Sequence, residues 1–445
     1  MKTLTVTLKQ HTPLIHFQHD QYGATLRASE VKPKLDRYLV RKVLGNNFSA
    51  CKPFLLGKEE LLEEYFNNGR CALNYKMSIV PHEEKNVKLK IIGPDEGGKY
   101  STEKFSMLLS NMGGKDNKSE LTNLVLCNHV ELKFTIWNSD LYDLIRKELP
   151  RFFAITNFGQ RETKGFGSFT VYRFGMEAPI KWDAAQYYEQ GCPMMLFKVS
   201  EDTELNKQKK IFDVCDFYWK CLKAGINYTR GNLLSKFYIK SFLYHYLNST
   251  LGRTWEKRSI KQQFRLGRNR DPITPNPNTP IFARAILGCP DKYVYDGARE
   301  VKVEHLIFDR ANEQQKIARI PSPIYLKPVC IGDFVYVYIL FNSEITDELN
   351  GLTEKRFQMT YNHITMDINI EVFLNETNYK EFISEYHEYL SSDSDVLDAL
   401  YCNDSINEYV DCSSNSLNEV YGFVPRDFNW RNILNGNQAV GFNEV

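Results

Sequence analysis

Several features that would assign the chain to a specialised class are missing from its 445 residues. No apolar run reaches the roughly 18–20 residues that a membrane-spanning helix needs. The start of the chain alternates apolar and polar residues where a signal peptide would carry an apolar block. The ten cysteines include no C-x-x-C pair, so zinc ribbons and thioredoxin-type redox sites have no support. We therefore expect a soluble, cytoplasmic protein with reduced thiols, no metal and no cofactor.

The net charge of +1 hides two segments of opposite sign. Residues 205–270 carry fifteen Lys or Arg against three acids, whereas residues 376–421 carry eleven acids against one lysine. Such asymmetry is typical of surfaces that meet an oppositely charged partner. The basic segment predicts contact with nucleic acid, although a solvated helix face would also be basic. The acidic segment is expected to screen charge or to dock elsewhere.

The order of the expected elements predicts an α+β protein with two domains. Residues 1–178 show the β-α-β-β-α-β order of a ferredoxin-like, or RRM-like, domain. In residues 179–445 the pattern restarts, so we expect a second ferredoxin-like domain with a basic helical insertion at 205–270 and an acidic C-terminal segment. The expected strands are 3–9, 72–80, 86–92, 130–137, 168–172, 194–199, 281–287, 300–308, 319–329 and 333–341. The expected helices include 101–109, 139–149, 208–224, 232–248 and 254–266.

The most informative motif is a loop at 157–167, between the second helix and the last strand of the first domain. Its three glycines permit positive φ angles and close approach of the backbone. Its two cations add charge, and N–H groups of such a loop can lie along a phosphate backbone. Its phenylalanine offers an apolar or stacking surface, while a tight turn with two exposed cations is the alternative. The candidate residues are Gly159, Arg161, Lys164, Gly165, Phe166 and Gly167.

Two other stretches carry cations at helical spacing. In residues 27–42 the spacing puts Lys34, Arg37 and Arg41 near one helix face, where they could contact phosphates or simply face water. In residues 253–270 the cations repeat at i, i+3 and i+7, which predicts a basic stripe. The candidate phosphate contacts from the two stretches are Arg27, Lys32, Lys34, Arg37, Arg258, Lys261, Arg265 and Arg268.

His16 and His19 lie close together in an expected loop. Paired histidines can act as general acid and base in metal-independent RNA cleavage through the 2′-hydroxyl. The alternative is two partly exposed loop histidines without a catalytic role. Their H-x-x-H spacing lacks carboxylate or cysteine ligands at useful positions, so it predicts no metal site.

The glycine-bearing loop, which reads F-G-Q-R-E-T-K-G-F-G-S-F over 158–169, resembles a family motif. It is similar to the G-x-R-x-x-x-G-F-G-S loop of the RAMP proteins, the RNA-binding subunits of CRISPR systems. Residues 12–32 resemble the T-P-L … L-R-x-S-x-x-K start of one RAMP branch, and residues 319–328 resemble its R-x-x-S-P-L-x-L-K strand. That branch supplies the first subunit of the Cmr, or type III-B, effector complex, and the resemblance spans roughly residues 4–340.

The resemblance implies a non-catalytic subunit that contacts guide RNA near its 3′ end and assists capture of target RNA. It also implies other subunits of a CRISPR effector complex as partners, and no membrane. Two alternatives remain open. One is a metal-independent CRISPR-repeat endoribonuclease that uses His16 or His19, although its glycine loop usually lies near the chain end. The other is a protein-only scaffold whose acidic tail docks a basic neighbour.

Overall fold

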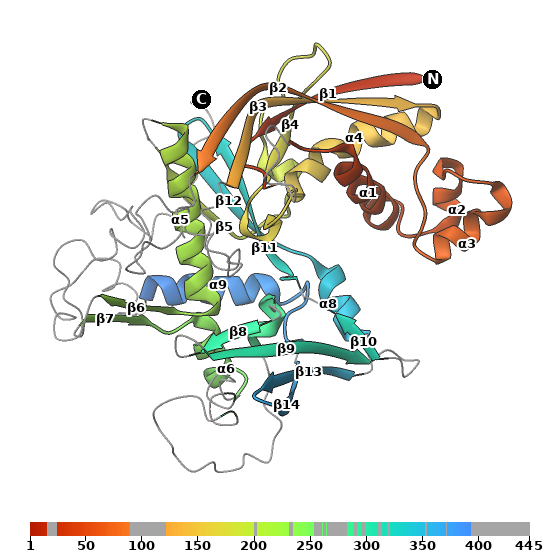
Figure 1. Cartoon of the computed structure of the whole chain (residues 1–445). Helices are drawn as coiled ribbons and strands as arrows, with labels where there is room; N and C mark the ends of the chain where they lie inside the picture. Colours follow the sequence, from red (N-terminus) through yellow and green to blue (C-terminus); the bar gives the residue numbers. More distant parts are fainter. Residues whose placement is uncertain are drawn as a thin grey trace. The chain divides into compact units, whose positions relative to one another are not determined.

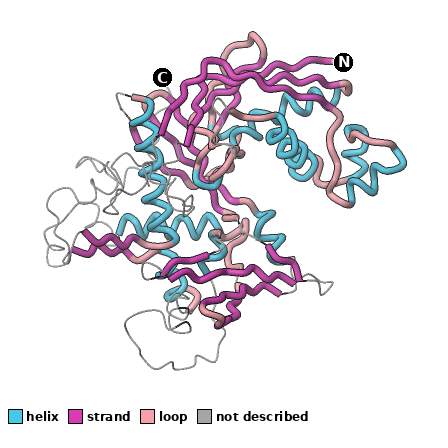
Figure 2. The backbone as a smooth tube through the Cα atoms, in the orientation of Figure 1, coloured by secondary structure: helices cyan, strands magenta, loops and turns pink. Residues whose placement is uncertain are grey.

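A computed structural model describes residues 1–15, 25–89, 122–199, 203–230, 235–252, 260, 264, 283–288, 292–295, 299–308, 314–317, 321–351, 354–370 and 372–392. They fall into two compact units, the first made of Met1–Phe212 and Leu326–Tyr338, and the second of Asp213–Tyr325 and Ile339–Val445. Helices alternate with antiparallel strands in both units (Figure 2), which confirms the α+β class. No helix among these residues is long and apolar enough to cross a membrane.

The first unit contains a four-stranded antiparallel sheet. Its strands are β1 (Lys2–Gln10), β2 (Tyr75–Leu89), β3 (Thr122–Ile136) and β4 (Phe169–Phe174), and its main helices are α1 (Ala28–Tyr38) and α4 (Ser139–Ile155). The strands lie in the order β2-β3-β1-β4, and all three pairings are antiparallel. With one helix after β1 and the other after β3, this is the split βαβ arrangement.

Alternation along β1 decides which face of the sheet is buried. Leu4, Val6 and Leu8 are almost fully buried and belong to the core of this unit. Leu35 of α1 and Ile145 of α4 join the same core, so both helices cover one face of the sheet (Figure 1). The packing of α4 on the sheet sets the position of its C-terminus. Because the loop before β4 starts there, the same packing sets where the loop begins.

The first unit has several shorter elements. Between α1 and β2 lie η1 (Leu39–Val43), α2 (Phe48–Cys51), η2 (Lys52–Phe54), η3 (Glu59–Leu61) and α3 (Leu62–Asn67). After α4 come η4 (Glu162–Lys164), η5 (Ala184–Gln186) and β5 (Met194–Lys198). A three-stranded sheet has the order β11-β12-β5, with β11 at Ile324–Ile331 and β12 at Phe334–Phe341. Helix α5 covers Glu204–Lys223.

The second unit carries a five-stranded antiparallel sheet, a hairpin and several helices. The strands of the sheet are β8 (Lys292–Tyr295), β9 (Arg299–Phe308), β10 (Gln314–Ile317), β13 (Glu354–Tyr361) and β14 (Ile364–Asn369). The unit also contains a hairpin of β6 (Ile226–Arg230) and β7 (Ser235–Ile239), with α6 (Phe242–Ser249), η6 (Ala283–Leu287), α8 (Ser343–Asn350) and α9 (Tyr379–Ser392). A second ferredoxin-like domain, and the boundary between residues 178 and 179, stay predictions.

Two expectations for the first unit are wrong. Within the described residues, the strands expected at 72–80 and 86–92 form the single strand β2, because β3 is long enough to pair with it across the expected turn. Residues 90–92 lie outside the described residues. The helix expected to stop before Pro150 continues to Ile155. A proline removes only one N–H donor from a helix, and the continued helix buries Phe152 and Phe153 in the core.

Two further expectations fail in the second unit. The helix expected at 232–248 is the strand β7 followed by α6, since β7 pairs in register with β6. The strand expected at 281–287 is the short helix η6, whose five residues are all buried. A short apolar run fits a buried helix as well as a buried strand, so periodicity could not separate the two. The helix expected at 101–109 lies outside the described residues, as does most of that at 254–266.

Candidate functional site

The loop at 157–168, called the glycine-rich loop from here on, joins α4 to β4. Two of its glycines are needed for steric reasons. Gly167 has φ +65°, and a Cβ there would lie 1.9 Å from the carbonyl oxygen of Phe158. Gly159 has φ +82°, and a Cβ there would lie 2.6 Å from the carbonyl oxygen of Ile15. The loop therefore folds back on itself and onto the segment after β1 in a way that only glycine permits.

Most N–H groups of the glycine-rich loop are used within the chain. Gly167 donates to Pro13 O at 2.9 Å, and Gln160 donates to Ile15 O at 2.8 Å. The N–H of Gly159 donates to the Glu30 carboxylate on α1. Within the loop, Lys164 donates to Arg161 O and Gly165 donates to Glu162 O. The expectation that these N–H groups line a phosphate backbone is wrong, because all five already have acceptors.

The two cations of the loop lie on a short turn. Arg161 has φ 58°, a left-handed conformation that is costly for a residue other than glycine, and it directly precedes η4. Lys164 ends η4, and its N–H donates to the Arg161 carbonyl at 2.8 Å. Both side chains are half-exposed. The turn therefore carries two cations on a backbone whose conformation is fixed by the rest of the loop.

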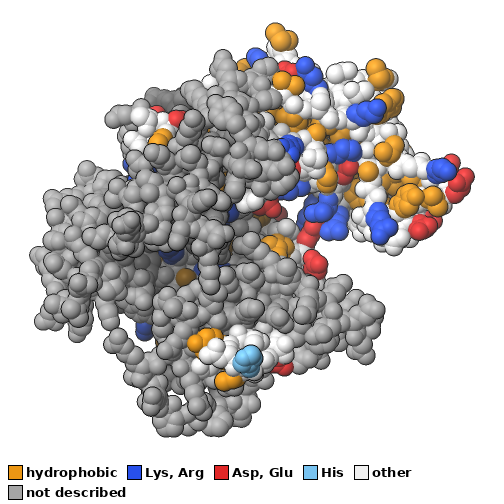
Figure 3. Space-filling model, viewed as in Figure 1, with side chains coloured by type: hydrophobic (Ala, Val, Ile, Leu, Met, Phe, Trp, Pro, Cys, Tyr) orange, Lys and Arg blue, Asp and Glu red, His pale blue; other side chains and the backbone are white. Residues whose placement is uncertain are grey.

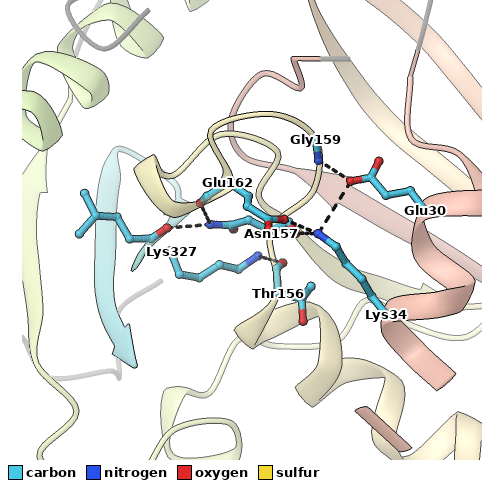
Figure 4. Close-up of polar contacts among 8 residues, drawn as sticks. Glu30, Lys34, Thr156, Asn157, Gly159, Glu162 and Lys327 are labelled. Atoms are coloured by element: carbon cyan, nitrogen blue, oxygen red, sulfur yellow. Dashed lines mark hydrogen bonds and ion pairs between the residues drawn. The ribbon is translucent and has the colours of Figure 1, made fainter. Parts of the chain in front are cut away.

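Lys34 connects α1 to the glycine-rich loop (Figure 4). Its Nζ donates to Asn157 O at 3.0 Å and to the carboxylate of Glu162, and it lies 3.8 Å from Oε1 of Glu30. It also lies 5.1 Å from the centre of the Phe158 ring. The carboxylates of Glu30 and Glu162 are not among the site residues predicted from the sequence, because an acidic residue within a basic motif is usually exposed to solvent. The ammonium group is thus surrounded by acceptors from its own chain.

The other predicted cations of α1 differ in surroundings. Lys32 donates to Asp36 Oδ2 at 2.8 Å and to Leu73 O at 2.9 Å, and its Nζ lies 3.7 Å from the centre of the Tyr75 ring. These contacts give Lys32 a structural role. Arg27 is half-exposed at the N-terminus of α1, and Arg37 is exposed near its C-terminus. In Figure 3, Lys and Arg side chains gather with a few carboxylates over the position of α1.

Phe166 is part of the core. Its ring is fully buried and stacks on the ring of Phe212, with the centroids 3.9 Å apart and the planes at 13°. A base needs one open face of a ring to stack on, and the fully buried ring of Phe166 offers none. Gly165, beside it, packs against Pro328, since a Cβ there would lie 2.9 Å from Cγ of that proline.

Several predicted site residues lie outside the described residues. These are His16 and His19 of the runner-up catalytic pair, and Arg258, Lys261, Arg265 and Arg268 of the basic stripe. The described residues contain no group of three or more His, Cys, Asp or Glu side chains that could hold a metal ion.

Two buried ionisable residues near the glycine-rich loop were missed. His11 accepts a hydrogen bond at Nδ1 from the N–H of Cys330 (3.0 Å), so Nε2 carries the proton and donates to Thr170 Oγ1 (2.8 Å). Burial lowers the pKa of His11 well below its usual value, and nearby lysines lower it further. Lys327 is fully buried, and burial lowers the pKa of its amine. A lysine inside the apolar run of β11 was the available signal.

A split βαβ sheet, with a glycine-rich loop bearing cations before its last strand, is the arrangement that the resemblance to the RAMP proteins predicts for the first unit. Family models identify the branch. The Cmr1 N-terminal domain matches residues 1–226, and the Cmr1 C-terminal domain matches residues 238–393. The chain therefore belongs to the Cmr1 family, which confirms the resemblance to the first subunit of the Cmr complex.

Comparison with solved structures gives remote similarities. The crystal structure of apo Cmr1 from Pyrococcus furiosus aligns with 11% identity and a TM-score of 0.36, over 77% of this chain and 89% of that chain. A cryo-EM structure of type III-B Cmr-beta bound to cognate target RNA aligns with 14% identity and a TM-score of 0.23, over 39% of this chain and 59% of that one. A search of curated proteins found no match.

Proposed function

We propose that the chain is a non-catalytic RNA-binding subunit of a type III-B CRISPR ribonucleoprotein. In this role it contacts guide RNA near its 3′ end and assists capture of target RNA. Membership of the Cmr1 family supports a place for the chain in a Cmr effector complex. A similar solved structure, that of Cmr-beta bound to cognate target RNA, is consistent with RNA as the ligand. Its partners are guide RNA, target RNA and the other subunits, in the cytoplasm. The ferredoxin-like fold of the second half belongs to the same proposal.

The observation that carries the RNA-binding role is the turn with Arg161 and Lys164. A guanidinium group binds a phosphate through two parallel hydrogen bonds, and an ammonium group acts as a compact charge. The loop backbone is already hydrogen-bonded to its own chain, so binding RNA costs little ordering of the turn. Lys34 of α1 contacts the loop directly. By helical spacing Arg27 and Arg37 lie near the same side of α1 as Lys34, so the proposal includes them in the basic surface.

These side chains favour recognition of the RNA backbone over recognition of bases. Phosphate contacts fix the register of a strand and carry no sequence information. The buried ring of Phe166 leaves the loop without an exposed aromatic platform. The basic stripe of Arg258, Lys261, Arg265 and Arg268, outside the described residues, belongs to this proposal as a second set of phosphate contacts. A subunit that holds any guide by its backbone suits a complex in which base pairing reads the target.

Neutralising the two loop cations tests the proposal. We expect the Arg161→Ala/Lys164→Ala double variant to bind single-stranded guide RNA more weakly. Its slope of log K against log salt should be shallower by about 1.4, at roughly 0.7 per lost phosphate contact. The matched control is Lys58→Ala/Arg70→Ala, which removes two exposed cations elsewhere in the first unit. Equal affinities and slopes for the two double variants would exclude the loop from the RNA site.

A further inference from the structure

One buried side chain ties together the two ends of the glycine-rich loop. The Nζ of Lys327 donates to the carbonyl oxygen of Thr156 at 2.8 Å and to that of Phe169 at 3.0 Å. Thr156 is the residue immediately before the loop, and Phe169 is the residue immediately after it. Lys327 is separated from both by more than 150 residues in sequence, so the tie depends on the fold of β11 and is invisible in the local sequence.

The two neighbours of Lys327 repeat the pattern through their backbone. The carbonyl oxygen of Leu326 accepts a hydrogen bond from Asn157 Nδ2 at 2.7 Å, at the start of the loop. The carbonyl oxygen of Pro328 accepts one from Ser168 Oγ at 2.6 Å, at the end of the loop. Three consecutive residues of β11 therefore form hydrogen bonds with both ends of the loop. Figure 4 shows the contacts at the start of the loop, with Thr156 and Asn157.

Burial makes Lys327 an expensive residue to place here. Its side chain is fully buried, and no ion pair is formed by it in the part of the chain that the structure describes. An amine taken out of water without a carboxylate partner costs free energy. An apolar side chain would avoid this cost but could not join two carbonyl groups. The cost is consistent with a role in fixing the loop.

We propose that Lys327 is a positioning residue for RNA binding. By tying Thr156 to Phe169 it fixes the loop conformation in which Arg161 and Lys164 are presented together. Lys327 does not itself reach RNA, because it is fully buried. This inference rests on the proposed function where RNA is concerned, whereas the tie can be tested without RNA.

The first experiment uses the full chain without RNA. Trypsin cleaves after Arg161 and Lys164 once the loop opens, so cleavage reports how firmly the loop is held. We expect Lys327→Met to speed cleavage at these two sites by about tenfold, and to speed hydrogen exchange at the Gly167 amide. The control is Lys198→Met, which removes an exposed lysine of β5. Cleavage and exchange rates equal to those of the control would overturn the tie.

The second experiment is a double-mutant cycle with guide RNA. A residue that acts only through the loop cations has little effect once those cations are gone. We expect Lys327→Met to weaken binding about fivefold to tenfold in the natural background, but less than twofold in the Arg161→Ala/Lys164→Ala background. Equal weakening in both backgrounds would mean that Lys327 acts through general stability, and would overturn its positioning role.

A milder variant covers the case in which Lys327→Met fails to fold. Ser168→Ala removes the single hydrogen bond to Pro328 O, and we expect the same pattern with a smaller effect. If Ser168→Ala changes neither trypsin cleavage nor the cycle, the hold on the loop from β11 is disproved. If the Arg161→Ala/Lys164→Ala variant leaves RNA affinity unchanged, the proposed RNA site is wrong. The trypsin experiment, which needs no RNA, then still shows whether Lys327 holds the loop.

Discussion

The ammonium group of Lys34 on α1 is hydrogen-bonded to the carboxylate of Glu162 in the glycine-rich loop. The pair joins two elements that both carry predicted phosphate contacts. Glu162 lies between Arg161 and Lys164 in sequence with a half-exposed side chain, so it places a negative charge inside the basic turn. A phosphate that approaches Lys34 must therefore compete with a carboxylate of the same chain.

We expect Glu162→Gln to strengthen RNA binding. The substitution keeps the size of the side chain and removes the competing charge, while Lys34 retains its hydrogen bond to Asn157 O. A partly exposed ion pair contributes about 0.4–1 kcal/mol, which corresponds to about a two- to fivefold gain in affinity at low salt. Fluorescence anisotropy with labelled guide RNA measures the change.

The control for this variant is Glu177→Gln, which removes an exposed carboxylate paired with Arg146 on α4. Both variants change the net charge by the same amount, so the control accounts for the effect of net charge on the attraction of RNA. A gain for Glu162→Gln that is no larger than the gain for Glu177→Gln would show that the carboxylate does not compete at Lys34.

Lys32 is expected to affect stability and to leave RNA binding unchanged. Asp36 is almost fully buried, and Lys32 is its cationic partner. Burial raises the pKa of Asp36 while Lys32 lowers it, so removing Lys32 leaves a buried carboxyl group without its charge partner. Lys32→Met should lower the free energy of unfolding by about 3 kcal/mol. Urea denaturation measures the loss, and Lys42→Met, at an exposed site, should stay within about 0.5 kcal/mol of the natural chain.

The order of elements and the family motif were readable from the sequence because they rest on local patterns. Alternation marked β1, and the glycines marked the loop between α4 and β4. The long strand β2 was split in two because Pro81 and its polar neighbours look like a turn when the partner strand β3 is unknown. The sequence predicts that α4 ends before Pro150, whereas it ends at Ile155. The burial of Phe152, which favours the longer helix, depends on the packed core and cannot be read from the local sequence.

The contacts of the candidate site could not be read in the same way. From the sequence, each cation is a possible phosphate contact. In the structure, however, the ammonium groups of Lys32 and Lys34 donate hydrogen bonds to carbonyl groups that are distant in sequence, those of Leu73 and Asn157. Phe166 read as a stacking surface because its partner, Phe212, lies 46 positions further along the chain (212 minus 166). Partners of this kind are set by tertiary packing, which a local pattern does not contain.

Gly167 is expected to be the most sensitive glycine of the loop. An alanine there would need a left-handed conformation and would place Cβ 1.9 Å from a backbone oxygen of Phe158, which cannot move as a side chain would. We expect Gly167→Ala to cost about 3 kcal/mol or more in unfolding free energy. Gly191→Ala is the matched control, since its φ is +75° with no atom within 4 Å, and should cost only about 1 kcal/mol. Equal losses in urea denaturation would show that the close approach is unimportant.

In the second unit, His387 should make stability depend on pH. Its Nε2 lies 2.9 Å from the Tyr218 hydroxyl oxygen, and burial lowers its pKa from 6.5 to about 4. Between these values the unfolded chain binds a proton at this site and the folded chain does not. Stability therefore falls as the pH drops from about 6.5 to about 4, by at most about 3 kcal/mol from this group.

His387→Gln keeps a hydrogen-bonding partner for Tyr218 and should flatten this part of the profile. Urea denaturation at pH 7 and pH 4.5 measures the slope, with His363→Gln at an exposed site as control. An unchanged slope for His387→Gln would mean that protonation of this ring is not coupled to folding.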